Sequence, residues 1–395
     1  MICINILVLC NIDLDEKWGD YTRVFSIMKS LSLQKNKIFI LIIRPDTKKP
    51  RVISFKKDGM NIIQIHPPSL GLSKNKGLSR HLKYLACIPL INKEASKIIN
   101  ENKIDWIYSY MPGTGSSLPA SRIKNKFHIP MILDLADMYS MIRPKLVVEK
   151  SFRDADKIFV ITQYLENLLI KKGIPQKKIF HVPNGVDLEL FDPKKYLAES
   201  QIIRKNFGAE KFLVFTGSLQ DLNIIIKSAK KVIQHIPNLK YIIVGDHRDP
   251  KKSYTAWQKE VKKEGLSDNF EFLGRKPRDE IPKYIMCADI CLDSFPDEPY
   301  FAAAHPIKLL EYGACGKPVV ATSVTETANL IEHGKFGYLA KPGNYEEYAN
   351  YLITLLESDD MAQKMGIEFG KFVRDNFDWN KISSKINDYL LKFNS

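Results

Sequence analysis

The sequence predicts an α/β protein in which two doubly wound, parallel-sheet domains face a cleft. The chain has 395 residues, which is too many for one ordinary core and enough for two domains of this kind. Apolar, strand-like runs alternate with helical patterns from start to finish, as is typical of parallel sheets covered by helices. A turn-rich stretch near residue 190 separates two such series.

The first series starts with the apolar run 4–9, which indicates a buried strand and not a signal peptide. A loop containing Gly19 follows, and then a helix over 21–34. We expect the first domain to span residues 1–193. Further strands are predicted at 38–44, 105–110, 130–136 and 157–162.

The second series begins after the turn at Asn184-Gly185 and after Pro193, which ends the local order. It predicts a second domain over 194–375 and a terminal helix over 376–395, which we expect to pack back on the first domain. Because ligands bind at the carboxyl ends of the strands in such sheets, the residues after each strand are the candidate site residues. The strands of this series are predicted at 212–218, 241–246, 270–274, 290–295, 318–323 and 337–341.

The composition is that of a soluble globular protein, with 45% hydrophobic and 26% charged residues. No apolar run reaches the roughly 18 residues that a membrane-spanning helix needs. The six cysteines are scattered, and Cys287 and Cys291 are not spaced as in a zinc knuckle. We therefore expect reduced thiols, a cytoplasmic location and no metal site.

The net charge of +14 is unevenly distributed along the chain. Residues 1–193 hold 30 Lys and Arg against 18 Asp and Glu, and the remaining residues hold 29 against 27. A basic first half is compatible with an anionic membrane surface, an acidic polymer or nucleic acid as a partner. Compositional drift in a chain rich in Lys, Ile and Asn would explain it as well.

The segment "HPIKLLEYGACGKPVV", residues 305–320, predicts a short helix followed by a strand. Pro306 suits the first helical turn, and Gly316 suits the position after the last one. Lys308 and Glu311 are three residues apart and share one face. Free backbone N–H groups, the helix dipole and Lys308 together would attract a phosphate, and Glu311 would accept hydrogen bonds from the vicinal hydroxyls of a ribose. The alternative is a surface ion pair worth about 0.2–0.5 kcal/mol.

Several segments, in this order, resemble the GT-B retaining glycosyltransferases of the family-4 type, the glycosyl transferases group 1. They are "HVPNGVDLELF", "FEFLG", "IPKYIMCADICLDSF", "KLLEYGACGKPVVAT", "NLIEHGKFGYLAKPGNYEEYANYLITLL" and "FDW". The resemblance covers most of the chain and implies two Rossmann-like domains in the GT-B architecture. The first domain would then face the acceptor, and the second would bind a nucleotide sugar.

The resemblance also implies roles for residues of the 305–320 helix. Glu311 is similar to the second Glu of the family's E-x7-E motif, which holds the ribose, whereas the first Glu is replaced by Ala303. The pattern P-x-K-L-x-E-Y is that of a subgroup in which Lys308 would face the donor diphosphate, beside the start of the helix at His305, Pro306 and Ile307. Ser218 stands where the family's phosphate clamp has an Arg, and the Lys of that clamp is missing. We therefore expect Lys308 to carry most of the cationic stabilisation.

Four further positions match the family's site. Gly19 matches the glycine loop beside the donor phosphate and the acceptor, with an ordinary turn glycine as the alternative. Asp137 resembles the Asp near the reaction centre, where it would orient an acceptor hydroxyl, unless it simply caps the next helix. Arg275 and Lys276 lie where the base-contacting loop occurs, and Lys276 would contact the donor.

These features predict a metal-independent, retaining hexosyltransferase without a cofactor. It would move a sugar from a nucleotide diphosphate sugar to a hydroxyl of a lipid-linked or polysaccharide acceptor, with no nucleic-acid partner. Two alternatives are a sugar-nucleotide epimerase of the same fold and a non-catalytic nucleotide-sugar or glycan-binding partner. The basic segment 70–91 predicts an amphipathic helix that would rest on the inner face of an anionic membrane, or an ordinary domain helix with a solvated basic face.

Overall fold

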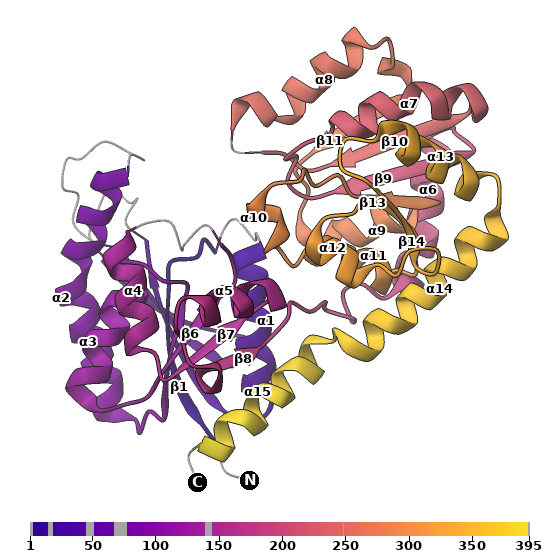
Figure 1. Ribbon diagram of the computed structural model, residues 1–395. Helices are drawn as coiled ribbons and strands as arrows, with labels where there is room; N and C mark the ends of the chain where they lie inside the picture. Colours follow the sequence, from indigo (N-terminus) through magenta and orange to yellow (C-terminus); the bar gives the residue numbers. More distant parts are fainter. Residues whose placement is uncertain are drawn as a thin grey trace. The chain divides into compact units, whose positions relative to one another are not determined.

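The computed structural model describes residues 3–14, 19–44, 51–66, 77–138, 144–247 and 249–393. They form two compact units (Figure 1). The first unit comprises Met1–Asn184 and Trp379–Ser395, and the second comprises Gly185–Asp378. The division lies at different residues from the predicted boundaries after 193 and 375. The difference arises because residues on both sides of the predicted range 194–375 pack with the hydrophobic core of the second unit, namely Val186, Phe191 and Phe377.

Within the described residues, the first unit contains an eight-stranded sheet in the order β3-β4-β2-β1-β5-β6-β7-β8. All neighbouring strands in it run parallel except β3 and β4. The strands are β1 (Asn5–Cys10), β2 (Lys37–Ile43), β3 (Arg51–Lys57), β4 (Met60–His66), β5 (Trp106–Tyr110), β6 (Met131–Leu135), β7 (Lys157–Val160) and β8 (Ile179–His181). The helices are α1 (Gly19–Leu33), α2 (Gly77–Glu101), α3 (Ser117–Phe127), α4 (Lys145–Asp154), α5 (Gln163–Lys171) and α15 (Trp379–Phe393).

Strands β3, β4 and β8 were not among the predicted strands. β3 is an edge strand that is mostly exposed, so its sequence lacks the apolar run by which the other strands were found. The turn between β3 and β4 consists of Asp58 and Gly59, which have φ angles of 49° and 76°. Two residues with positive φ form the commonest hairpin turn, and Asp-Gly is its usual sequence. That dipeptide was the signal that could have located the hairpin.

In the second unit, the described chain forms a six-stranded parallel sheet in the order β11-β10-β9-β12-β13-β14. The strands are β9 (Lys211–Thr216), β10 (Leu239–Val244), β11 (Phe270–Gly274), β12 (Ile290–Leu292), β13 (Val319–Thr322) and β14 (Gly337–Ala340). The helices are α6 (Leu197–Phe207), α7 (Asn223–His235), α8 (Tyr254–Lys263), α9 (Ile281–Met286), α10 (Pro299–Ala302), α11 (Ile307–Ala314), α12 (Thr325–Leu330), α13 (Tyr345–Leu356) and α14 (Asp359–Asn376). The two parallel sheets covered by helices confirm the predicted fold class.

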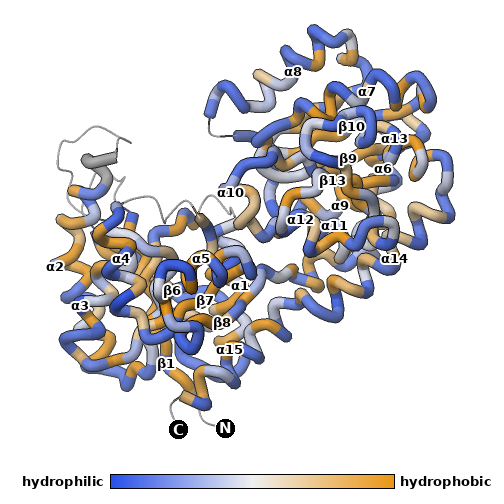
Figure 2. The backbone as a smooth tube through the Cα atoms, viewed as in Figure 1, coloured by the Kyte–Doolittle hydropathy of each residue, from blue (hydrophilic) through white to orange (hydrophobic). Residues whose placement is uncertain are grey.

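Each sheet lies between helices, and its side chains form the cores. Figure 2 shows hydrophobic residues concentrated along the central strands of each unit, whereas hydrophilic residues dominate outer helices such as α8. In the second unit, one core lies on the α7 and α13 face of the sheet and another on the α9 and α11 face. Helix α15 belongs to the core of the first unit, where Tyr389 stacks on Phe180 with 4.0 Å between ring centroids. No helix in the described ranges is both long and apolar enough to cross a membrane.

The strand order of the second unit contains a switch point. From β9 the chain continues outward through β10 and β11, then returns to β12 on the other side of β9 and continues outward through β13 and β14. Helices that follow β9 and β12 therefore leave the sheet in opposite directions, and sheets of this kind bind their ligands at the carboxyl ends of two such strands. The candidate site lies at this point.

Candidate functional site

Helix α11 begins directly after Pro306 and ends as the sequence predicts. Gly316 has a φ angle of 68°, and its N–H donates to the carbonyl of Gly313 at 2.7 Å. The N–H of Lys317 donates to the carbonyl of Tyr312 at 3.0 Å. These two bonds form a Schellman motif, in which only glycine adopts the left-handed conformation without strain. The predicted C-terminal role of Gly316 is therefore confirmed.

Tyr312 fastens α11 to the carboxyl ends of two strands. Its hydroxyl accepts a hydrogen bond from the backbone N–H of Thr216 at 2.8 Å and donates to the carbonyl of Leu292 at 3.3 Å. Thr216 is the last residue of β9 and Leu292 the last of β12. Burial raises the pKa of Tyr312 well above its ordinary value, so the hydroxyl keeps its proton. The helix is thus held at the switch point of the sheet.

Lys308 lies in the first turn of α11 and is almost completely enclosed. Its Nζ lies 2.5 Å from Oδ1 of Asp293, which follows β12 and is fully buried. The same Nζ lies 4.1 Å from the ring centroid of Phe215 and 4.6 Å from that of Phe295. Only 11% of the Lys308 side chain is exposed. The ammonium group is therefore held by a carboxylate and two aromatic rings, both of which favour a cation.

A glycine lies beside this lysine at the end of β9. Gly217 has a φ angle of 113°, and a Cβ atom added there would lie 3.7 Å from Cδ of Lys308. Gly245, at the end of the neighbouring strand β10, has a φ angle of 147°, and a Cβ atom there would meet the carbonyl oxygen of Gly217 at 1.8 Å. Both positions therefore require glycine. Because Gly217 has no side chain, a ligand can approach Lys308 from that side.

Glu311 points to a different partner, although it shares the helix with Lys308. Its Oε1 lies 2.7 Å from a guanidinium nitrogen of Arg278, and 6% of the Glu311 side chain is exposed. Arg278 belongs to a single helical turn, Arg278–Glu280, after β11, and its guanidinium lies 5.3 Å from the ring centroid of Phe191. The alternative of a solvated ion pair between Lys308 and Glu311 is therefore wrong, because both charges are enclosed and each has a partner on another loop.

The other predicted residues of the second unit lie near the same strand ends. Ser218 follows Gly217, is half-buried, and accepts a hydrogen bond from the side-chain amide of Gln220 at 3.3 Å. Lys276 is half-buried after β11. His305 is buried, and its ring lies 5.6 Å from that of Phe377. Ala303, where the family's first Glu would stand, is completely buried.

Gly19 and Asp137 belong to the first unit. Gly19 is the exposed first residue of α1, and Asp137 is half-buried after β6. The next described helix, α4, has Pro144 as its N-cap and no side-chain cap. Residues 139–143 lie outside the described residues, so the alternative in which Asp137 caps the helix that follows it stays a prediction.

The sequence did not identify Asp293, Arg278 or Gly217 as site residues. Each directly follows a strand or lies in the loop after one, so the rule that ligands bind at the carboxyl ends of parallel strands points to all three. Burial raises the pKa of Cys287 to about 12 and that of Cys315 well above its ordinary value, so thiolate is scarce at both. Within the described part of the chain, no group of three or more His, Cys, Asp or Glu side chains is placed to hold a metal ion.

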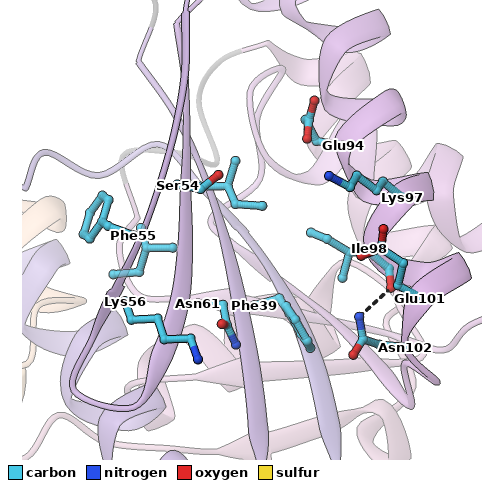
Figure 3. A pocket seen from close by; sticks show the side chains of 12 residues that line it. Phe39, Ser54, Phe55, Lys56, Asn61, Glu94, Lys97, Ile98, Glu101 and Asn102 are labelled. Carbon is cyan, nitrogen blue, oxygen red and sulfur yellow. Dashed lines mark hydrogen bonds between the residues drawn. The ribbon is translucent and has the colours of Figure 1, made fainter.

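Two surface depressions on the first unit contain none of these residues. One, of about 370 Å³, lies between strands β2 to β4 and the end of α2, with Phe39, Phe55 and Ile98 among its apolar lining (Figure 3). It includes Asn61, near the start of β4, and thus lies toward the amino ends of the strands. The other, of about 420 Å³, lies between α4 and the residues after α5. Parallel sheets do not normally bind their ligands at the amino ends.

Two family models match the chain, and together they cover most of it. Residues 34–190 match the model described as Glycosyltransferase Family 4, and residues 199–371 match the model described as Glycosyl transferases group 1. The chain belongs to the group 1 glycosyltransferases.

Curated relatives of this glycosyltransferase are distant. An uncharacterized glycosyltransferase of Methanocaldococcus jannaschii is 27% identical over 312 residues, which are 76% of this chain and 80% of the relative. D-inositol 3-phosphate glycosyltransferase of Corynebacterium glutamicum is 26% identical over 254 residues, 61% of this chain and 59% of the relative. A putative teichuronic acid biosynthesis glycosyltransferase of Bacillus subtilis is 25% identical over 258 residues, 64% of this chain and 62% of the relative. The chain thus spans about three-fifths of the last two relatives.

Solved structures share the fold over nearly the whole glycosyltransferase. Anabaena HepE in complex with UDP and glucose has a TM-score of 0.74 at 18% identity, covering 98% of this chain and 100% of that one. Sucrose-phosphate synthase from Thermosynechococcus elongatus has a TM-score of 0.75 at 15% identity, covering 99% of each. These likenesses confirm the predicted GT-B architecture.

Proposed function

We propose that this group 1 glycosyltransferase is a retaining, metal-independent hexosyltransferase. It takes a sugar from a nucleotide diphosphate sugar and places it on an acceptor hydroxyl. The observation that carries the proposal is the enclosed Lys308 at the start of α11, beside the bare backbone of Gly217 and at the switch point of the sheet. Structures of the HepE relative bound to UDP or to UDP-glucose support a nucleotide sugar as the donor.

The proposed mechanism places each charge of the reaction against a group of the protein. As the bond to the anomeric carbon breaks, negative charge develops on the leaving diphosphate. Lys308 and the free N–H groups of the first turn of α11 stabilise that charge in a site with little water. The acceptor hydroxyl attacks from the face that the diphosphate leaves, and the diphosphate takes its proton. The anomeric configuration is thereby retained.

We assign the remaining predicted residues by their position. Asp137 orients the acceptor hydroxyl, and Glu311 accepts hydrogen bonds from the ribose. The other proposed donor contacts are Gly19, Ser218, Lys276, His305, Pro306 and Ile307.

The test has two stages. UDP-glucose, GDP-mannose and other nucleotide sugars are screened for a rise in melting temperature, because a ligand that binds only the folded state stabilises it. The donor that stabilises most is then incubated with candidate acceptors, and proton NMR assigns the anomeric configuration of the new glycoside. An inverted product would contradict the retaining mechanism. Release of an epimerised sugar would favour the epimerase, and binding without turnover would favour the non-catalytic partner.

We further propose a lipid-linked or polysaccharide acceptor reached at an anionic membrane surface. The names of relatives that act in teichuronic acid biosynthesis or on phosphatidylinositol support such an acceptor. In α2, Leu82 and Leu85 are 43% and 41% exposed, and the basic excess of residues 1–193 favours an anionic surface. Lys83, Tyr84 and Ile88 of the same helix are buried, so only part of the expected membrane-facing side is exposed.

The remaining residues of the predicted amphipathic segment, namely Leu72, Lys74 and Lys76 and the side chains of Leu78 and Arg80, lie outside the described residues. Flotation with vesicles tests the surface directly. The protein is expected to float with vesicles that contain anionic lipid at low salt and to stay behind with neutral vesicles. Leu82→Gln with Leu85→Gln should abolish flotation, whereas Leu33→Gln, at an exposed leucine of α1, should not. Protein that stays in the soluble fraction in every case would favour a soluble acceptor.

A further inference from the structure

We propose that Asp293 is a built-in counter-ion that limits how tightly the site at α11 holds a nucleoside diphosphate. The proposal rests on the proposed function, because it takes the diphosphate of the donor as the ligand of Lys308. At the diphosphate, the family resemblance assigns a cation, Lys308. The proposal adds a residue of the opposite charge beside it.

The carboxylate of Asp293 forms a buried ion pair with Lys308. The side chain of Asp293 is fully buried, and its Oδ1 lies 2.5 Å from the Nζ of Lys308. Within the described part of the chain, neither carboxylate oxygen has a hydrogen-bond donor other than this ammonium group. A buried carboxylate without a partner is strongly unfavourable. Asp293 therefore depends on Lys308, and Lys308 is neutralised by Asp293.

The surroundings strengthen this pairing. The rings of Phe215 and Phe295 flank the ammonium group and exclude water from it. Electrostatic interactions are stronger in such surroundings than in water. A diphosphate that approaches past Gly217 therefore meets a lysine whose charge is already compensated by Asp293, with 2.5 Å between Nζ and Oδ1.

Lys308 can respond to the diphosphate in two ways, and in both of them Asp293 lowers the affinity for the diphosphate. If Lys308 stays on Asp293 and turns its other N–H bonds to the phosphate, the carboxylate repels the incoming anion. If Lys308 moves to the phosphate, Asp293 is left buried without a partner. Either way, Asp293 weakens the binding of the diphosphate, and removal of its charge strengthens it. Because the leaving diphosphate is also the product, this limit on affinity lets the product go.

The decisive experiment measures the dissociation constants of UDP and of uridine by calorimetry. The ratio of the uridine constant to the UDP constant reports the contribution of the diphosphate alone. GDP and guanosine are measured in parallel, and the nucleoside with the larger ratio is used. Asp293→Asn keeps the size of the side chain and removes its charge. We expect this variant to raise the ratio about tenfold.

Asp289→Asn is the matched control. Asp289 precedes β12, whereas Asp293 follows it. The carboxylate of Asp289 lies 3.0 Å from the guanidinium group of Arg204. This substitution breaks an ion pair of the same unit at the other end of the strand. It is expected to lower the melting temperature and to leave the ratio unchanged.

A second pair of variants applies even if Asp293→Asn does not fold alone. In Lys308→Met, Asp293 is an uncompensated negative charge near the diphosphate, so the ratio falls. Adding Asp293→Asn to Lys308→Met must raise it again, whereas a residue that only positions Lys308 would have no further effect once the lysine is gone. A ratio that is unchanged or lower on loss of Asp293, in either background, would overturn the inference. A wild-type chain that binds neither diphosphate better than its nucleoside would overturn the donor assignment as well.

Discussion

The guanidinium group of Arg278 and the carboxylate of Glu311 lie 2.7 Å apart, although Arg278 belongs to the helical turn after β11 and Glu311 to helix α11. The pair fixes one oxygen of Glu311 and leaves the other for a ligand. It also means that Glu311 contributes to the fold as well as to the proposed ribose contact. Any test of Glu311 must therefore separate binding from stability.

Glu311→Gln should weaken the binding of uridine by roughly ten- to a hundredfold, because hydrogen bonds to a charged group contribute about 1.5–3 kcal/mol. The same variant should bind 2′,3′-dideoxyuridine as wild type does, since that ligand lacks the hydroxyls in question. Calorimetry with both ligands gives the comparison. Equal losses for the two ligands would point to a structural role through Arg278, and no loss for either would remove Glu311 from the site.

Lys308→Met should lower kcat by about a hundred- to a thousandfold, with a smaller effect on KM, because the charge of the lysine counts most as the diphosphate departs. Steady-state kinetics with the donor found by the thermal screen provide the measurement. Lys335→Met is the control, since Lys335 forms an exposed ion pair with Glu332 on the surface. Retention of wild-type kcat in Lys308→Met would assign the clamp to another cation.

Gly217→Ala should both destabilise the second unit and weaken UDP binding. The φ angle of 113° strains an alanine, and its Cβ would contact Lys308. Gly343→Ala is the matched control, because Gly343 also has a positive φ, 79°, but nothing within 4 Å of the added atom. Both variants are expected to melt at lower temperature, and only Gly217→Ala to bind UDP more weakly. Equal UDP affinities would show that the space beside Lys308 is not used.

Thiol reactivity at pH 8 should be confined to one of the six cysteines. Cys3 is exposed and the other five are buried. Burial raises the pKa of Cys10 and of Cys87 to about 12, so thiolate is scarce at pH 8, and a buried thiol is also shielded from the reagent. Ellman's reagent should therefore label about one thiol in the native protein and six in denaturant. Rapid labelling of several native thiols would contradict the described packing.

Most strands could be predicted because a strand buried on both faces is a continuous apolar run. β1, β9 and β10 are of this kind. β3 is exposed along most of its length, and β8 has only three residues, so neither carries that pattern. The end of α11 was also predictable, because the left-handed conformation at Gly316 and the ring of Pro318 end a helix whatever its tertiary contacts are.

The partners of Lys308 and Glu311 could not be predicted, for a different reason. Spacing along a helix shows which side chains share a face, but it does not show which loops that face meets. Helix α11, which carries Lys308, is hydrogen-bonded through Tyr312 to the ends of both β9 and β12, where Asp293 lies, and this strand order is not contained in the local sequence. A polar residue directly after a strand identifies a candidate, whereas its contact depends on the order of strands in the sheet.

Helix α15 follows the whole second unit in the chain and yet completes the core of the first unit, where Trp379, Ile382 and Ile386 are buried. The second unit is one uninterrupted stretch, Gly185–Asp378. On the ribosome, the second unit can therefore finish folding while the first still exposes the apolar groove that α15 will cover. A chain cut after Asp378 should show slow hydrogen exchange in the second unit and fast exchange in β1 and β2. The first unit, most of which precedes the second unit in the chain, is thus the unit that completes its fold later.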